Sequence, residues 1–277
     1  MTAIDFCAHA LRRHDQDRYL TTLFARPPAR ARLIALYAFN LELARIAESV
    51  KEPMLGEIRL QWWRETLDGV RDDQAREQPV AKALVESGAG SLVKQDAVNA
   101  LIEARKRDLD PAPPDDRAAL ERYAEATSST VLSLALDVLE IDDTDAREAA
   151  RSIGIAWTLI GAIRSTQFLA RQGRTLYPAD LMRRSGTNRS MLHAAPADQA
   201  VRSAVAELAG WAHEHLAKAR TFSPTRAALP PLLLASLADG YLARLATVGY
   251  DPFDPRLVIS PLARQLRLMW RTAINRL

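Results

Sequence analysis

Adjacent aspartates are the first residues of this chain whose type and spacing could do chemistry. A hard cation such as Mg²⁺ binds several carboxylate oxygens that converge on one point, and paired acids could begin such a site. The pairs are Asp72-Asp73, Asp115-Asp116 and Asp142-Asp143, the last followed by Asp145. Each pair falls at an expected helix end or in a loop, where aspartate accepts hydrogen bonds from unsatisfied backbone N–H groups. We therefore expect helix capping rather than metal binding at these positions.

Histidine and cysteine give weaker grounds for catalysis. His213 and His215 lie on either side of Glu214, but residues two apart on a helix point to different sides. A zinc-binding helix of the common protease type needs its histidines four apart. The single cysteine, Cys7, has no neighbouring base and cannot form a disulfide framework, so we expect a reducing compartment.

Arginines gather in two segments, although the chain as a whole is nearly balanced, with 37 basic and 34 acidic residues. Residues 12–32 hold six arginines and two aspartates, and residues 251–277 hold five arginines and two aspartates. Arg264, Arg267 and Arg271 share one helical face, which suits a diphosphate or an acidic membrane surface. A solvated face is the simpler interpretation of any single arginine. The segments carry no nucleic-acid-binding motif, so we expect no nucleic-acid partner.

Helices must position these residues, because the composition leaves little room for a sheet. The 277 residues include 11 glycines and 6% aromatics, with 48% hydrophobic residues, which favours one all-α domain over residues 1–277. The helix that begins at Pro53 is expected to bury Leu55, Ile58, Trp62 and Trp63. Further helices are expected after Pro27-Pro28 and after Asp115-Asp116, and over residues 91–109, 143–171, 196–222, 224–248 and 260–276.

Membrane and export signals are weak in this sequence. No stretch reaches the roughly 18 to 20 apolar residues that a membrane-spanning helix needs. The apolar run Ile153–Ile163 is closed off by Arg151 and Arg164, so we expect a buried core helix there. The first five residues lack the order of a signal peptide, and a cytoplasmic location is expected.

Several segments, taken in their order along the chain, resemble one known family. They are Asp17–Leu20 with Leu36–Asn40, Tyr123 with Ser128–Val131, Ile153–Arg164 with Gly173–Pro178, and Gly249–Asp251 with the basic helix behind it. These segments are similar to the squalene/phytoene synthases, and the similarity spans nearly the whole chain. The resemblance implies an all-α, single-domain helical bundle of the isoprenoid synthase type around a central cavity.

The family's chemistry depends on acids that this resemblance allows us to locate. Its enzymes join two prenyl diphosphates head to head, and two helices each carry a pair of aspartates four residues apart. That spacing places both carboxylates on one helix face, where they hold Mg²⁺ and promote departure of the diphosphate. The allylic cation that forms needs a dry, apolar cavity.

The first of the two helices departs from this pattern. By the resemblance, its aspartate positions fall on Ala44 and Glu48, and the residue after the first falls on Arg45. Tyr37 and Leu41 complete the face that this helix would present. One acid is left, and a lone carboxylate cannot organise a multi-magnesium diphosphate site.

The second helix has lost both acids. Its aspartate positions fall on Ser165 and Leu169, and the polar pair that precedes them falls on Thr158 and Gly161. Shifting the alignment of either helix by one turn does not restore an aspartate pair, because no aspartate lies in residues 151–179 or 34–51. The family-like residues that persist are Arg164, Arg174 and Tyr177.

The first hypothesis is a non-catalytic member of the family. The stretch Glu52–Arg64 resembles the branch with degenerate aspartate motifs that includes the mitochondrial complex I assembly factor. Paired tryptophans there also suit an ordinary helix core, but Glu57 and Arg59 add more charge than packing requires. The resemblance implies a prenyl-lipid-binding protein or a respiratory complex assembly factor, and no cofactor is expected.

The second hypothesis is an active prenyltransferase that condenses farnesyl or geranylgeranyl diphosphate head to head. Arg45, Arg164 and Arg174 could then hold phosphate as charge-assisted donors, and Mg²⁺ would be a cofactor under this hypothesis alone. A third alternative is a helical interaction protein without a ligand.

The expected partners follow from the first hypothesis. They are a prenyl diphosphate or another lipid, a respiratory complex subunit, and a membrane surface that the basic segments meet from a peripheral position at the inner membrane. The positions that the resemblance assigns on the two helices, together with Arg174 and Tyr177, are expected to line a pocket rather than to catalyse a reaction.

Overall fold

Every regular element of the described chain is a helix. The computed structural model describes residues 1–71 and 77–274 and contains no strand in these ranges, so the all-α prediction is confirmed. Asp72-Asp73 and Arg276 lie outside the described residues. Within the same ranges, no helix combines the length and the apolar composition needed to cross a bilayer.

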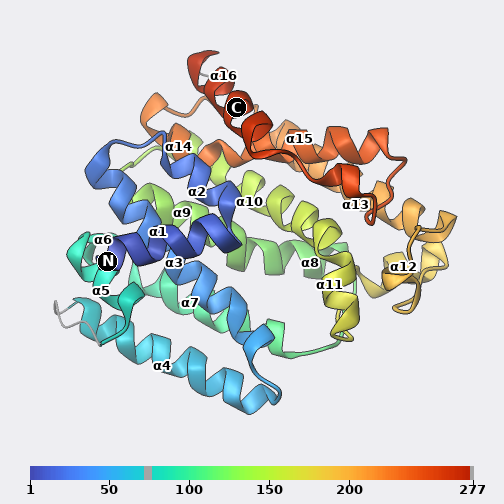
Figure 1. Ribbon diagram of the computed structural model, residues 1–277, viewed down its shortest axis with the longest axis horizontal. Coiled ribbons are helices and arrows are strands. Elements are labelled where there is room, and N and C mark those ends of the chain that lie inside the picture. Colours follow the sequence, from blue (N-terminus) through green and yellow to red (C-terminus); the bar gives the residue numbers. More distant parts are fainter. Residues whose placement is uncertain (72–76, 275–277) are drawn as a thin grey trace. The chain divides into compact units, whose positions relative to one another are not determined.

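The chain divides into two compact units, and element labels follow Figure 1. Unit 1 comprises Met1–Asp110, Thr130–Ala150 and Ser223–Leu232, and unit 2 comprises Pro111–Ser129, Arg151–Phe222 and Leu233–Leu277. The single domain over residues 1–277 and its central cavity stay predictions.

Unit 1 is organised around α3 (Pro27–Ser49), which begins with two prolines in its first turn, as the sequence predicts. Helix α3 contacts α1, α2, α4, α5 and α9. The helices of this unit besides α3 are α1 (Ala3–His14), α2 (Gln16–Thr22), α4 (Pro53–Arg71), α5 (Pro79–Glu86), α6 (Ala89–Leu92), α7 (Gln95–Arg105), η1 (Lys106–Leu109), α9 (Thr130–Val138), η4 (Arg226–Ala228) and α14 (Leu229–Leu232).

Helix α4 buries a different face from the one predicted. Leu55 and Ile58 are 50% and 59% exposed, so the prediction that they are buried is wrong. The buried line instead runs along the helix through Gly56, Leu60 and Trp63, which are spaced like one helical face. An added Cβ at Gly56 would collide with Leu109, so a glycine permits the close approach of η1 at this turn. Leu55 and Ile58 therefore point away from the core.

Unit 2 holds most of α10 (Thr144–Arg164), whose first residues are assigned to unit 1, and the C-terminal helices. Its remaining elements are α8 (Arg117–Ala124), the π-helical turn η2 (Glu125–Ser129), α11 (Thr166–Arg171), α12 (Ala179–Ser185), η3 (Met191–His193), α13 (Gln199–Ala219), α15 (Leu234–Thr247), η5 (Pro255–Leu257) and α16 (Pro261–Ile274). Helix α15 contacts both α13 and α16.

The helix expected over residues 143–171 is interrupted at Ser165. Helix α10 ends at Arg164, and α11 begins at Thr166. The Ser165 hydroxyl donates to the carbonyl of Gly161 at 2.8 Å, and the Thr166 hydroxyl donates to the carbonyl of Ile163 at 2.7 Å. Side chains that bond back onto their own helix bend it, and two in succession account for the break.

Two of the expected aspartate caps are confirmed. Asp116 accepts a hydrogen bond from the backbone N–H of Ala119 at 2.7 Å at the start of α8. Asp143 accepts one from Ala146 at 3.0 Å at the start of α10. Backbone hydrogen bonds lower the pKa of Asp143, with Thr225 as the largest contributor and Ala146 next.

Candidate functional site

Five of the predicted site positions lie on α3 in unit 1. Tyr37 and Leu41 are buried, Ala44 is half-buried, and Arg45 and Glu48 are exposed. The helix is continuous through all five, so Ala44 and Glu48 lie one turn apart on it. This face offers one carboxylate and one guanidinium where a metal-binding helix of the family would offer two carboxylates.

Tyr37 is a packed, neutral phenol. Its side chain is fully buried, and burial raises the pKa of its hydroxyl above the ordinary value. The guanidinium carbon of Arg18 lies 6.0 Å from the ring centre, and Arg18 forms a salt bridge of 2.7 Å with Asp15. Tyr37 therefore belongs to a buried polar cluster contributed by the start of the chain.

The middle of α10 packs closely against η2 within unit 2. Thr158 donates a hydrogen bond to the hydroxyl of Ser128 at 2.8 Å, which joins two of the family-like segments. An added Cβ at Gly154 would lie closer than 3.0 Å to backbone atoms of Ser129, whereas one at Gly161 would meet nothing within 4 Å. Gly161, unlike Gly154, therefore borders open space.

A buried hydroxyl pair closes the break between α10 and α11. Tyr177 is fully buried, and its hydroxyl lies 2.8 Å from the hydroxyl of Thr166. Because a carbonyl can only accept, Thr166 gives its proton to the Ile163 carbonyl, and Tyr177 must donate to Thr166. Burial raises the pKa of Tyr177, so the hydroxyl keeps the proton that this arrangement needs.

Leu169 and Arg174, two predicted positions that follow the break at Ser165, lie on either side of a turn. Leu169 is half-buried on α11, and its carbonyl accepts a hydrogen bond from the backbone N–H of half-buried Arg174 at 2.9 Å. Gly173 supplies the positive φ of 69° that the turn requires. Ser165 and Leu169 thus present a hydroxyl bonded to its own backbone and an alkyl group, and neither can ligate Mg²⁺ as a carboxylate does.

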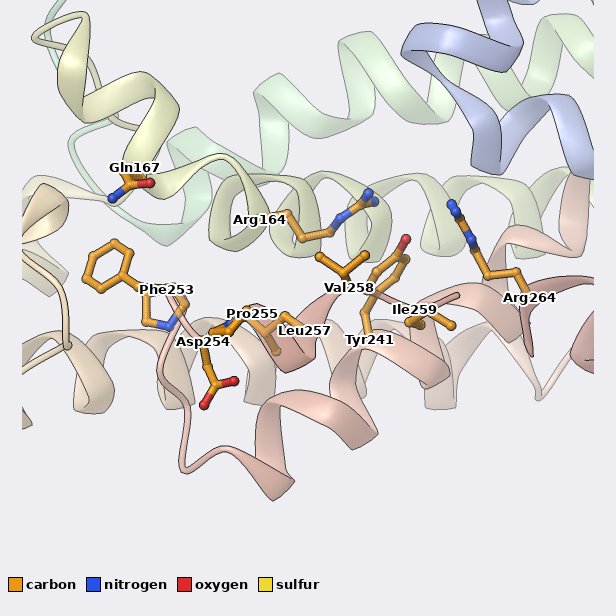
Figure 2. Close-up of a pocket in the computed structure, with 11 residues that line it drawn as sticks. Arg164, Gln167, Tyr241, Phe253, Asp254, Pro255, Leu257, Val258, Ile259 and Arg264 are labelled. Atoms are coloured by element: carbon orange, nitrogen blue, oxygen red, sulfur yellow. The ribbon is translucent and has the colours of Figure 1, made fainter. Parts of the chain in front are cut away.

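Arg164 lies at the wall of a pocket of about 420 Å³ in unit 2 (Figure 2). Its guanidinium carbon is 4.0 Å from the ring centre of Tyr241 and 5.8 Å from that of Trp157, which is cation–π geometry. The lining residues besides Arg164 and Tyr241 are Gln167, Pro252, Phe253, Asp254, Pro255, Leu257, Val258, Ile259 and Arg264.

The pocket combines two guanidinium groups with an apolar wall. Arg164 and Arg264 approach it from α10 and α16, and Figure 2 shows Tyr241 in the region between these two residues. Arginine forks bind phosphate or carboxylate groups, while Phe253 and Val258 suit an alkyl or prenyl chain. The pocket can therefore take an anionic head group that carries an apolar tail.

The sequence pointed to only part of this pocket. The family resemblance predicts Arg164, and the spacing of arginines on the last helix includes Arg264. Neither pattern predicts Tyr241. The available signal was the family-like turn Gly249–Asp251, which leads into the lining segment 252–259. Hydrogen bonds from the side chain and the backbone N–H of Arg256 lower the pKa of Asp254 to about 2, so the pocket also carries one persistent negative charge.

Metal ligands are not concentrated in either unit. Among residues 1–71 and 77–274, no group of three or more histidine, cysteine, aspartate or glutamate side chains has a geometry that could hold a metal ion.

Comparison with known proteins gives consistent matches along the chain. The squalene/phytoene synthase family profile matches residues 11–264. NADH dehydrogenase (ubiquinone) complex I, assembly factor 6, of Bos taurus is 33% identical over 91% of this chain and 76% of its own length. The Homo sapiens protein of the same name is 31% identical over the same shares. A solved dehydrosqualene synthase in complex with ligand superposes with a TM-score of 0.81 at 17% identity, over 99% of this chain and 96% of its own. That structure shows the fold alone.

Proposed function

The chain belongs to the squalene/phytoene synthase family, and we propose that it acts as a non-catalytic assembly factor for a respiratory NADH dehydrogenase. The observation that carries the proposal is the chemistry of four side chains. The positions that would hold the family's Mg²⁺-binding aspartates are Ala44, Glu48, Ser165 and Leu169.

These four side chains cannot replace the lost acids. Ala44 and Leu169 have no donor atom, and the hydroxyl of Ser165 is engaged with the carbonyl of Gly161. Glu48 can supply one carboxylate, which leaves a diphosphate with most of its charge unneutralised. Arg45, which follows the first position, adds positive charge there and disfavours a cation further.

The relatives support the assembly role. The bovine and human proteins at 33% and 31% identity are both named as complex I assembly factors, and each match covers nine tenths of this chain. We propose that this chain shares their class of partner, a subunit of a respiratory complex. We also propose a working location at the inner membrane surface, without a cofactor.

The start of α4 is the surface that suits a protein partner. Met54, Leu55 and Ile58 are exposed there, and their spacing places them within about one turn of each other on the helix. Charges of both signs surround them, including Glu57 and Arg59, and such a mixed polar rim around an apolar centre is typical of protein–protein interfaces. The same stretch carries the resemblance to the assembly-factor branch.

Deletion of the gene in the organism that encodes the protein tests the assembly role. We expect the amount of assembled, NADH-oxidising complex on native gels to fall, and the wild-type gene to restore it. A Glu48→Gln gene should restore it equally, because no metal chemistry depends on that carboxylate. Wild-type levels of complex in the deletion strain would contradict the assembly role.

A second candidate function is favoured by the pocket beside Arg164. Its two guanidinium groups and apolar wall support binding of a prenyl diphosphate or another anionic lipid, with or without turnover. Calorimetric titration with farnesyl diphosphate in the absence of Mg²⁺ should detect binding, and Arg164→Gln should weaken it about tenfold or more. Equal affinity of wild type and Arg164→Gln would exclude this pocket as the site.

A further inference from the structure

Helix α16 turns its apolar face to solvent. Trp270 is 67% exposed and Leu262 is 64% exposed, and both are large side chains that a helix normally buries. The exposed apolar residues of this region form what we call the α16 stripe, and they are Val258, Leu262, Leu266, Met269, Trp270 and Ile274. Residues 262, 266, 269 and 270 recur at helical spacing, so they share one continuous face.

The arginines of α16 face the opposite way, into unit 2. Arg264 is only 8% exposed. Arg267 donates to the backbone carbonyl of Ser236, and Arg271 lies 3.4 Å from the carboxylate of Asp239. The helix is therefore held to α15 by its polar side. Figure 1 shows the ribbons of the two neighbouring helices. This orientation corrects the expectation of a solvated basic face.

The charges near the α16 stripe indicate which kind of partner could cover it. From residue 255 to the end, the sequence has five arginines and neither aspartate nor glutamate. Arg220, Arg267 and Arg271 all approach the single carboxylate of Asp239 beside the stripe, so guanidinium groups outnumber acids there. This positive surplus favours a layer of negative charge over a second copy of the same helix, which would bring like charges together. The mixed charges around Met54 and Ile58 on α4 give no such preference.

We propose that the α16 stripe inserts into the head-group layer of an anionic lipid bilayer, with α16 lying in the plane of the membrane. Apolar side chains on one face, a tryptophan among them, and arginines on the other are the pattern of helices that bind in this way. The inserted face reaches the acyl boundary, while the arginines that hold α16 to α15 stay on its protein side and add longer-range attraction to acidic lipids. The inference rests on the proposed inner-membrane location and deepens it by naming the surface.

Vesicle flotation with the full chain tests the proposal. Wild-type protein should float with vesicles made of equal parts of phosphatidylcholine and phosphatidylglycerol, and less with phosphatidylcholine alone. The double variant Leu266→Ser, Trp270→Ser should bind the anionic vesicles about tenfold or more weakly. The matched control Met54→Ser, Ile58→Ser removes equally exposed apolar groups from α4 and should bind like wild type. Circular dichroism verifies that each variant is folded.

The tryptophan gives a second readout that a folding defect cannot imitate. Brominated lipids should quench part of the wild-type fluorescence, and Trp270→Phe should remove that part while flotation persists. Absence of wild-type flotation, or equal flotation of the stripe variant, would overturn the proposal. A dimer in sedimentation that only the stripe variant breaks would assign the stripe to a second copy instead. No respiratory complex is needed, so this test can fail or succeed independently of the assembly role.

Discussion

Two glycines of α10 should respond in opposite ways to the same substitution. Gly154 and Gly161 lie two turns apart on one helix, and replacing either by alanine gains about 1 kcal/mol of intrinsic helix propensity. At Gly154 the added Cβ meets Ser129 closer than 3.0 Å, and the atoms it meets include backbone N and Cα. At Gly161 it meets nothing within 4 Å. The surroundings of the two residues therefore decide the sign of each effect.

The magnitude follows from what must move. A side-chain rotation of Ser129 cannot relieve the collision, because the added Cβ meets its backbone atoms. The Ser129 hydroxyl also donates to the carbonyl of Arg151 at 2.6 Å. Overpacking of this kind costs up to about 3 kcal/mol, so the net loss for Gly154→Ala is about 2 kcal/mol. Its Tm should fall by roughly 4 °C or more. Gly161→Ala should gain up to about 1 kcal/mol.

Thermal and urea unfolding of wild type and both variants measure these changes under identical conditions. Gly161→Ala is the internal control for helix propensity, because it carries the same substitution on the same helix without the collision. The close packing of α10 on η2 would be refuted if Gly154→Ala were as stable as Gly161→Ala.

Three further outcomes are expected. Thr166→Val leaves the buried Tyr177 hydroxyl without its acceptor and should lower the free energy of urea unfolding by about 2 kcal/mol, whereas Tyr177→Phe should lower it by about 1 kcal/mol. The reverse order would contradict the assignment of Tyr177 as the donor. Burial, with Glu42 adding to it, raises the pKa of Cys7 to about 12, so iodoacetamide should label this thiol at about pH 8 only after unfolding, as mass spectrometry can detect. Hydrogen bonds from Arg256 lower the pKa of Asp254 to about 2, below its ordinary 3.8, so their contribution to stability is present above that ordinary value and is lost as pH falls toward 2. The Asp254 carboxyl carbon should titrate by NMR with a midpoint near 2, and a midpoint near 4 would contradict these bonds.

Local signals in the sequence predicted much of the helical framework. The prolines at 27 and 53 begin helices in the structure as expected, and Asp116 and Asp143 cap helices where a metal site could have been supposed. These features depend on backbone chemistry within a few residues, which a single sequence displays directly. The family resemblance added the fold, which short-range patterns alone do not specify.

Other features depended on contacts between distant segments. Hydrophobicity predicted that Ile58 is buried, but the approach of Leu109 to Gly56 turns that side chain outward. Spacing grouped the arginines of α16 on one face, but the contacts with Ser236 and Asp239 on α15 are needed to show that this face points inward. The break at Ser165 depends on hydroxyl bonds to the helix backbone, which a helical hydrophobic pattern does not display.

The sequence predicted the kind of residue that lines the pocket better than it predicted which segments form it. The resemblance named Arg164 as a phosphate-binding candidate, and Arg164 does line a pocket with a second arginine. Its aromatic partner Tyr241 comes from a helix about eighty residues later, and no spacing rule connects the two. The roles of the predicted positions on α3 stay predictions.

Pyrophosphate release measures most directly whether the protein is non-catalytic. The purified wild-type protein is incubated with farnesyl or geranylgeranyl diphosphate and Mg²⁺, beside an active squalene synthase as positive control. Because Ala44, Ser165 and Leu169 stand where the family needs carboxylates, we expect no release above the blank without protein. Release that depends on both Mg²⁺ and the protein would contradict a non-catalytic role.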